Sequence, residues 1–226
     1  MAVTGGVEVP RARPARNDAR TRFLLGCGVV AGPLFMGVAL AQAFTRPGFD
    51  LRRQAISMLS LGDLGWIQIA NFLVTGVLAL ALAVGVRRAL RPGRGGTWAP
   101  LLIGAYGVGL VAAGIFHPDP AFGFPPGAPA GMPAQSSLHS VLHNVSFFVA
   151  FIGLIAACLV MARREAGLGR RGWAAYCAAT AIAAPVFIGL ASAGVVASGV
   201  ALAILGVVTS GWIAVISTRL LTQPEN

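Results

Sequence analysis

The chain has 226 residues, of which 56% are hydrophobic and only 11% are charged, and its mean hydropathy is +0.77. Soluble domains carry about 25% charged residues, so the composition excludes a disordered protein, argues against a soluble enzyme and predicts an all-α polytopic membrane protein. The formal net charge is +10, and the 17 basic residues are all arginines. These arginines stand in short runs between long apolar segments, which indicates membrane topology, so no nucleic-acid partner is expected.

Six apolar segments are each long enough to cross a bilayer as a helix, which takes about 20 residues. They cover residues 23–44, 66–86, 97–117, 138–162, 172–192 and 196–218. The alternation typical of a β-barrel is absent from the sequence, so helices are the expected spanning structure. The predicted organisation is a disordered arginine-rich tail over 1–22, a six-helix transmembrane domain over 23–218 and a short tail over 219–226.

The first segment also has features of a secretory signal, namely its arginine-rich start and the string Ala39-Leu-Ala-Gln-Ala43. Its long charged region and its near-full spanning length favour an uncleaved helix. The fifth and sixth segments are separated by only a few residues, so they are expected to form a tight antiparallel hairpin.

The distribution of arginines predicts a multi-pass protein of the plasma membrane with both termini in the cytoplasm. Fourteen of the 17 lie in the two tails and in the second and fourth loops, and the third and fifth loops have none. The other three, Arg46, Arg52 and Arg53, lie in the first, outer loop. Trp66, Trp98, Trp173 and Trp212 fall near predicted span ends, as an interfacial aromatic belt requires.

Membrane lipids are the partners that these charges predict. The arginine-rich tail and the pair Arg52 and Arg53 are expected to face anionic headgroups, at about 1 kcal/mol for each basic residue. The first outer loop, residues 45–65, is amphipathic and predicts a short helix on the membrane surface, with Asp63 capping the second span. The second outer loop, residues 118–137, holds six prolines and three glycines, so it is expected to be irregular and to lie over the bundle or in solvent.

Small and polar residues inside the spans predict how the helices pack. Gln68, Asn71 and Thr75 follow helical spacing, so they are expected to bond a neighbouring helix from one face. The spacings of Gly28 with Gly32 and of Gly199 with Ala203 allow close helix approach. The three cysteines, Cys27, Cys158 and Cys177, all fall within spans, which predicts no disulfide in the outer loops.

The residues that could carry chemistry gather on the outer side. His139 and His143 are four residues apart, which places both imidazoles on one helix face with Cβ atoms about 5–6 Å apart. His117 and Asp119 end the preceding antiparallel helix at a similar depth. Three imidazoles and a carboxylate are ligands that suit zinc, so these four residues form a hypothetical metal site.

Other interpretations of the same residues remain open. The imidazoles and Asp119 can simply cap helices or bond water and headgroups. If a reaction is catalysed, Asp119 and Ser57 are the candidate catalytic residues, with Arg52 and Arg53 holding a phosphate. Haem ligation by His117 with His139 or His143 is a weaker alternative.

A resemblance to a known family rests on the first loop and second span. The segment Arg52-Arg-Gln-Ala-Ile-Ser-Met-Leu-Ser-Leu-Gly-Asp-Leu-Gly-Trp-Ile-Gln-Ile-Ala-Asn-Phe72, together with Phe116-His-Pro-Asp-Pro120, resembles the bacterial membrane family called domain of unknown function 998. The likeness covers residues 23–218 and implies an uncleaved six-helix protein of no assigned activity. His139 and His143 are also similar, by analogy only, to the zinc-binding His-x-x-x-His pair of alkaline ceramidase and adiponectin-receptor hydrolases.

Two functions therefore stand as expectations. The first is a non-enzymatic binding, sensing or accessory component of the membrane with a polar cluster on its outer side. The alternative is a zinc-dependent hydrolase of a lipid or lipid-linked substrate at the outer leaflet, in which the metal activates water.

Overall fold

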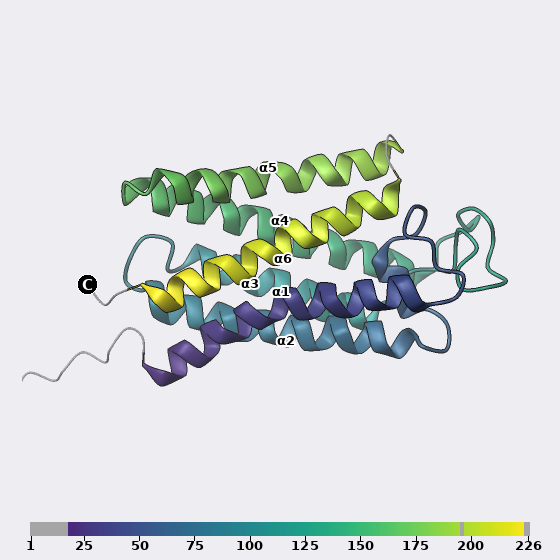
Figure 1. The fold of residues 1–226 in the computed structure, drawn as a ribbon, viewed down its shortest axis with the longest axis horizontal. Helices are drawn as coiled ribbons and strands as arrows, with labels where there is room; N and C mark the ends of the chain where they lie inside the picture. The colour runs from purple at the N-terminus through teal and green to yellow at the C-terminus, as the bar shows by residue number, and fades with distance from the viewer. Residues whose placement is uncertain (1–17, 195–196, 224–226) are drawn as a thin grey trace, which may run out of the picture.

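The computed structural model describes residues 18–194 and 197–223, and within them the chain is all-α (Figure 1). The elements are α1 (Ala19–Thr45), η1 (Ile56–Ser60), α2 (Gly65–Leu90), α3 (Trp98–Ile115), α4 (Leu138–Gly167), α5 (Arg171–Ala193) and α6 (Ser198–Thr222). All six long helices are long and apolar enough to cross a membrane, which confirms the predicted spans.

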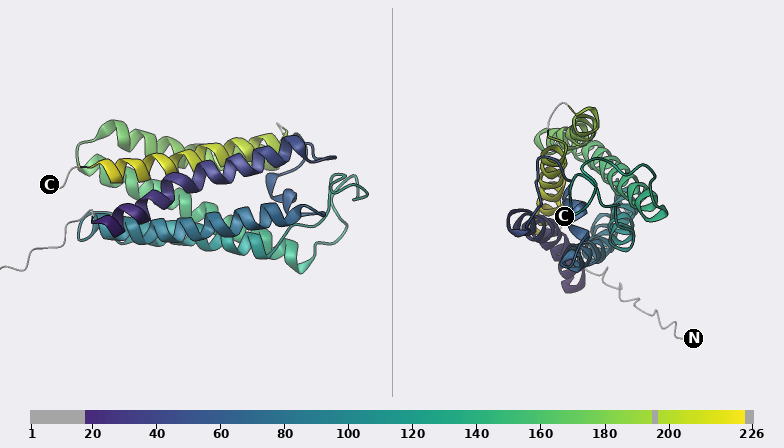
Figure 2. Two further views of the ribbon diagram at one scale, coloured as in Figure 1. Left: turned by 60° about the horizontal axis from the view of Figure 1, so that its bottom comes forward. Right: turned by 90° about the vertical axis from the view of Figure 1, so that its right-hand side faces the viewer.

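The six long helices stand side by side in a closed ring. Each helix packs on the next one in the chain, and α6 returns to pack on α1, so that a view along the bundle shows the helices surrounding its axis (Figure 2). The loop end of the bundle is defined here as the end that carries residues 46–64 and 116–137. The arginine end is the opposite end, where α1 begins and α6 ends.

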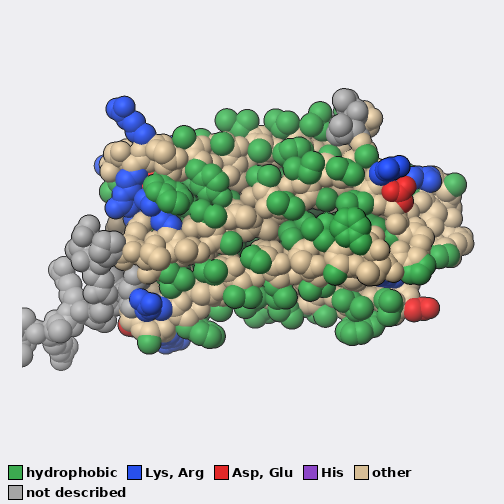
Figure 3. All heavy atoms as spheres, in the orientation of Figure 1, with side chains coloured by type: hydrophobic (Ala, Val, Ile, Leu, Met, Phe, Trp, Pro, Cys, Tyr) green, Lys and Arg blue, Asp and Glu red, His purple; other side chains and the backbone are tan. Residues whose placement is uncertain are grey.

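The outer surface explains why such a ring is a membrane protein. Exposed side chains along the helices are large and apolar, such as Val77, Val108 and Ile152. Arginine and acidic side chains gather at the two ends of the face shown in Figure 3, with an apolar zone between them. These helices are apolar both on the side that faces the bundle and on the side that faces outward, which is typical of helices surrounded by lipid and not by water.

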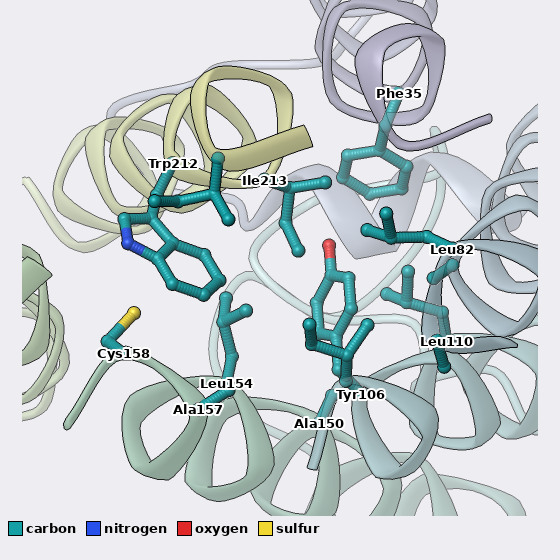
Figure 4. Close-up of a cluster of buried hydrophobic side chains, with 14 of the residues drawn as sticks. Phe35, Leu82, Tyr106, Leu110, Ala150, Leu154, Ala157, Cys158, Trp212 and Ile213 are labelled. Atoms are coloured by element: carbon teal, nitrogen blue, oxygen red, sulfur yellow. The ribbon is translucent and has the colours of Figure 1, made fainter. Parts of the chain in front are cut away.

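The interior is filled by side chains from all six helices. In the close-up of Figure 4, Trp212 of α6 points toward Leu154 and Cys158 of α4, and its Nε1 donates to the Cys177 Sγ at 3.4 Å. Trp212 is fully buried and lies in the middle of α6. Its predicted place in the interfacial belt is therefore wrong, whereas Trp66 and Trp98 are exposed at the starts of α2 and α3.

Glycines allow close contacts of α6, and the helix approach predicted from the spacing of Gly28 and Gly32 is confirmed, whereas Gly199 approaches a loop. A Cβ on Gly32 of α1 would lie 2.3 Å from the Ser210 carbonyl oxygen of α6, and one on Gly28 would lie 2.2 Å from the Ser217 Oγ. At the loop end, a Cβ on Gly199 would lie 2.2 Å from the Gln54 carbonyl oxygen. These distances are shorter than any Cβ contact, so α6 can sit against α1 and the first loop only because these positions lack side chains.

Several local expectations need correction. Residues 1–17 of the predicted disordered tail lie outside the described residues, but 19–22 are helical, because Asp18 caps α1 by accepting from the Thr21 N–H at 2.8 Å. Residues 219–222, predicted as tail, extend α6. The first loop forms the short η1, whose side chains are mostly buried against α1 and α2 and not laid on the membrane surface. No side chain caps α2, so the capping role of Asp63 is also wrong.

Candidate functional site: a cavity at the loop end of the bundle

A cavity of about 390 Å³ opens inside the loop-end half of the ring. All six long helices, η1 and the loop after α3 contribute to its walls. Its size falls within the range of small-molecule sites, about 300–1,000 Å³. On α6 its lining runs from Ser198 to Ser210, and at 1.5 Å per residue this is a depth of about 18 Å, roughly one leaflet of a bilayer.

The walls change character with depth. The deeper part is lined mainly by aromatic and aliphatic side chains: Phe35, Phe72, Leu110, Phe147, Phe151 and Leu202. Tyr106, Ser146, Thr209 and Ser210 also line it, but the hydroxyls of Ser146 and Thr209 donate to carbonyl oxygens of their own helices. The part near the loop end mixes apolar side chains such as Met58, Phe122 and Met132 with the carboxylate of Asp119 and with small neutral polar groups: Ser57, Ser136, Ser140, Asn144, Ser192 and Ser198. A site with an apolar interior and a few convergent polar groups is suited to an amphipathic molecule.

The two long loops close the mouth of the cavity by binding each other. Arg46, one of the outer-loop arginines, donates to the Leu59 and Leu61 carbonyl oxygens at 2.6 and 2.7 Å and lies over the Phe124 ring. The buried Gln54 donates to the Phe122 carbonyl oxygen at 2.9 Å. The loops therefore fold over the bundle, one of the two predicted positions. Burial lowers the pKa of Arg46, the expected effect of desolvating a cation, and the nearby negative charge of Asp63 opposes this shift.

Asp119 organises the start of α4 at the rim of the cavity. Its carboxylate accepts from the Ser137 backbone N–H at 2.8 Å and from the Ser137 hydroxyl at 2.5 Å, and Ser137 in turn caps α4 by accepting from the Ser140 N–H. The Ser137 hydroxyl, followed by its backbone N–H, lowers the pKa of Asp119 below its usual 3.8. The carboxylate is thus ionised at neutral pH and engaged in a structural role.

Two buried polar side chains, His143 and Tyr106, line the wall of the cavity. The Nδ1 of the buried His143 contacts the Phe116 carbonyl oxygen at 2.7 Å, so Nδ1 carries the proton and Nε2 of the neutral ring is an acceptor. Tyr106 is buried deep in the wall, and in Figure 4 its hydroxyl points into the centre of the bundle near Phe35 and Ile213. Within the described residues this hydroxyl makes no hydrogen bond. It can therefore bond a polar group of a ligand in the mainly apolar part of the cavity.

Behind the cavity, α1 and α2 are joined by buried amides. The Gln42 Nε2 donates to the Gln68 Oε1 at 2.8 Å, and the Asn71 Nδ2 donates to the Phe35 carbonyl oxygen at 3.0 Å. The predicted bonding of Gln68 and Asn71 to a neighbouring helix is confirmed, whereas the hydroxyl oxygen of Thr75, the third member of that face, has no hydrogen-bond partner in the described part of the chain. Gln42 is not among the residues predicted above to bond another helix, although a lone glutamine within an apolar span is itself a signal for such a bond.

The four hypothetical metal ligands do not converge. His143 faces the Phe116 carbonyl, Asp119 binds Ser137, and the His117 and His139 rings stack on each other with centroids 4.9 Å apart. Among the described residues, no three His, Cys, Asp or Glu side chains are placed to hold one metal ion. Stacked imidazoles also leave no room for a haem between them. The i, i+4 spacing places His139 and His143 one turn apart on the same side of α4. His143 is buried in the bundle, whereas His139, at the start of the helix, is exposed.

The remaining candidate residues divide between the cavity and the surface. Ser57 and Asp119 both line the cavity, yet no hydrogen bond joins them in the described part of the chain, and their catalytic roles stay predictions. Arg52 and Arg53 are exposed at the loop end, where the Arg53 Nη2 donates to the Ala130 carbonyl oxygen at 3.2 Å. Neither arginine lines the cavity.

Comparison with known families decides the assignment of the chain. The sequence profile of a family described as a protein of unknown function, DUF998, matches residues 29–219. The chain belongs to the DUF998 family. The matched range contains every residue that lines the cavity of this DUF998 protein. No curated protein and no solved structure matches the chain.

Proposed function

We propose that this DUF998 protein is a non-enzymatic binding component of the plasma membrane whose cavity holds a single-chain amphiphile with a neutral polar head. The observation that carries this proposal is the composition of the cavity wall, which is mainly aromatic and aliphatic in its deeper part and gathers most of its serine and asparagine side chains near the loop end. The apolar chain would lie between Phe72, Phe151 and Leu202, and the head would meet the serines and Asn144. The ionised Asp119 at the rim disfavours an anionic head.

A lateral route between α4 and α5 supports access from the lipid phase. Phe148 lines the cavity and is also 53% exposed on the outer surface. Opposite it, α5 contains Pro185, and none of the described residues from Pro185 to the end of the helix is buried. A helix segment with so few buried contacts separates from its neighbours at small cost.

The distribution of arginines supports a membrane orientation in which the cavity lies on the outer side. The arginine end would lie in the cytoplasm and the loop end outside, so the cavity would serve the outer leaflet. Arg52 and Arg53 would then face headgroups of that leaflet, and the arginine-rich N-terminal tail would face anionic lipid on the inner side. A cysteine introduced at Ala128, in the second long loop, should react with a membrane-impermeant maleimide in intact cells; protection there would contradict the orientation.

Binding of a monoacylglycerol to protein in lipid nanodiscs tests the function. Leu202→Trp adds bulk inside the cavity, whereas Ile204→Trp, two residues along α6, adds it to a side chain that is 41% exposed on the outer face. We expect Leu202→Trp to weaken binding at least about tenfold, since overpacking costs about 1–3 kcal/mol, and Ile204→Trp to leave it unchanged. Equal affinities for the two variants would refute binding in the cavity.

Three further measurements define the ligand class and test the hydrolase hypothesis. Tyr106→Phe should weaken binding about 2- to 10-fold if its hydroxyl donates to the ligand. Oleate, which has a comparable chain and a carboxylate head, should bind more weakly than the neutral amphiphile. Recovery of intact monoacylglycerol after incubation fits a binding protein, and its hydrolysis would favour the hydrolase hypothesis.

A further inference from the structure

A second cluster of charges lies at the opposite end of the bundle, where α4, α5 and α6 meet. Glu165 is the only carboxylate among the described residues that is fully buried. Its Oε2 accepts from the Arg219 Nη2 at 2.6 Å and lies 3.7 Å from the Arg170 Nη1, while its Oε1 accepts from Arg164. Three guanidinium groups around one carboxylate give the cluster a net charge of +2.

This excess charge borders a surface pocket of about 540 Å³ between α5 and α6. The Arg219 guanidinium is fixed in its wall by stacking on Trp173, with 4.0 Å from Cζ to the ring centroid. Three buried nitrogens of lining residues make no hydrogen bond within residues 18–194 and 197–223: Arg219 Nε, Arg170 Nη1 and Gln223 Nε2. Buried donors without acceptors are costly, so the pocket is suited to a ligand with several acceptor oxygens and negative charge.

From these contacts we infer that the pocket binds the phosphate group of an anionic molecule, either a phospholipid headgroup or free phosphate. The rest of the lining favours the lipid. Ala214 and Val215 continue the pocket along α6 toward the middle of the bundle, and Val215 is exposed. This places an apolar strip for an acyl chain directly beside the cationic group. The site is independent of the loop-end cavity, with which it shares no lining residue.

Two neighbouring arginines provide a matched test. Arg170 lines the pocket, whereas Arg171 is exposed and does not line it. Arg170→Gln and Arg171→Gln each remove one charge, so nonspecific attraction to anionic lipid falls equally in both. Native mass spectrometry would measure adducts of phosphatidylglycerol and of diacylglycerol, which lacks the phosphate. We expect phosphatidylglycerol alone to bind, with affinity reduced about tenfold by Arg170→Gln and less than about twofold by Arg171→Gln.

Two further measurements test the role of Gln223 and distinguish a phospholipid headgroup from free phosphate. Gln223→Met removes a second donor without a change of charge and should also weaken the phosphatidylglycerol adduct. Displacement of the lipid by excess inorganic phosphate would identify free phosphate as a sufficient ligand; persistence of the lipid would show that the acyl chain is needed. The inference is overturned if phosphatidylglycerol does not bind, if diacylglycerol binds equally well, or if the two arginine variants lose affinity equally.

Discussion

The contact between α1 and α6 closes the ring, and substitution of one glycine tests whether that closure depends on close backbone approach. In Gly32→Ala the new Cβ would lie 2.3 Å from the Ser210 carbonyl oxygen and 2.8 Å from its carbon. Ordinary carbon–oxygen contacts between backbones are about 3.3–3.6 Å, so the helices must separate by about 1 Å. Such a gap forfeits about a quarter to a half of each dispersion contact across it, and overpacking of this kind costs about 1–3 kcal/mol.

Gly37→Ala, on the same helix, supplies the control because nothing lies within 4 Å of the position of its Cβ. Both variants gain the same helix propensity, about 1 kcal/mol, so the difference between them isolates the steric cost. Cys27, Cys158 and Cys177 are buried, and their reaction with a thiol-reactive dye on heating reports unfolding. We expect Gly32→Ala to melt several degrees below Gly37→Ala, at about 2–4 °C per kcal/mol. Equal melting temperatures would refute the packing argument.

Three other substitutions test the loops and the buried ion cluster with the same assay. Arg46→Gln should lower the free energy of unfolding by about 1–3 kcal/mol, because it removes two charge-assisted bonds to backbone carbonyls of the first loop. The exposed Arg52→Gln should have little effect, and equal losses would contradict the role of Arg46 in holding this loop. Because the pKa of Asp119 is lowered in the folded protein, its contribution is present above about pH 4 and is lost as the pH falls through the folded-state pKa. Ser137→Ala should therefore flatten the decline of the melting temperature in acid, and an unchanged profile would argue against the Asp119 interaction. Glu165→Gln should cost about 3–5 kcal/mol, since it leaves buried guanidinium groups without their counter-charge; a variant as stable as wild type would show that the ion cluster adds no stability.

The fold could be predicted from the sequence because the membrane restricts the alternatives. An apolar run of spanning length must be a helix, and short loops between such runs require antiparallel neighbours. The same reasoning located the bonding face of Gln68 and Asn71, since polar groups in lipid must find partners. The helix ends were less predictable, because capping contacts such as that of Asp18 extend α1 beyond its apolar part.

The site was harder to predict because it depends on which way side chains point and on how the ring closes. Spacing placed His139 and His143 on one face, but the direction of each ring follows from its neighbours: the Phe116 carbonyl for His143 and the stacked His117 for His139. Trp212 likewise lies toward the end of a predicted span, but its ring is fully buried between helices and bonds Cys177, which spacing along the chain does not indicate. The cavity arises where eight segments, the six long helices, η1 and the loop after α3, enclose a space, and no local pattern in the sequence records that.

Photocrosslinking of a monoacylglycerol that carries a diazirine on its chain is the most direct measurement of whether the amphiphile lies inside the bundle. After irradiation in nanodiscs and peptide mapping, we predict that the label is found on Phe147, Phe151 and Leu202, which line the cavity. Labelling confined to Ile152 and Ile204, which face outward on the same two helices, would contradict the account.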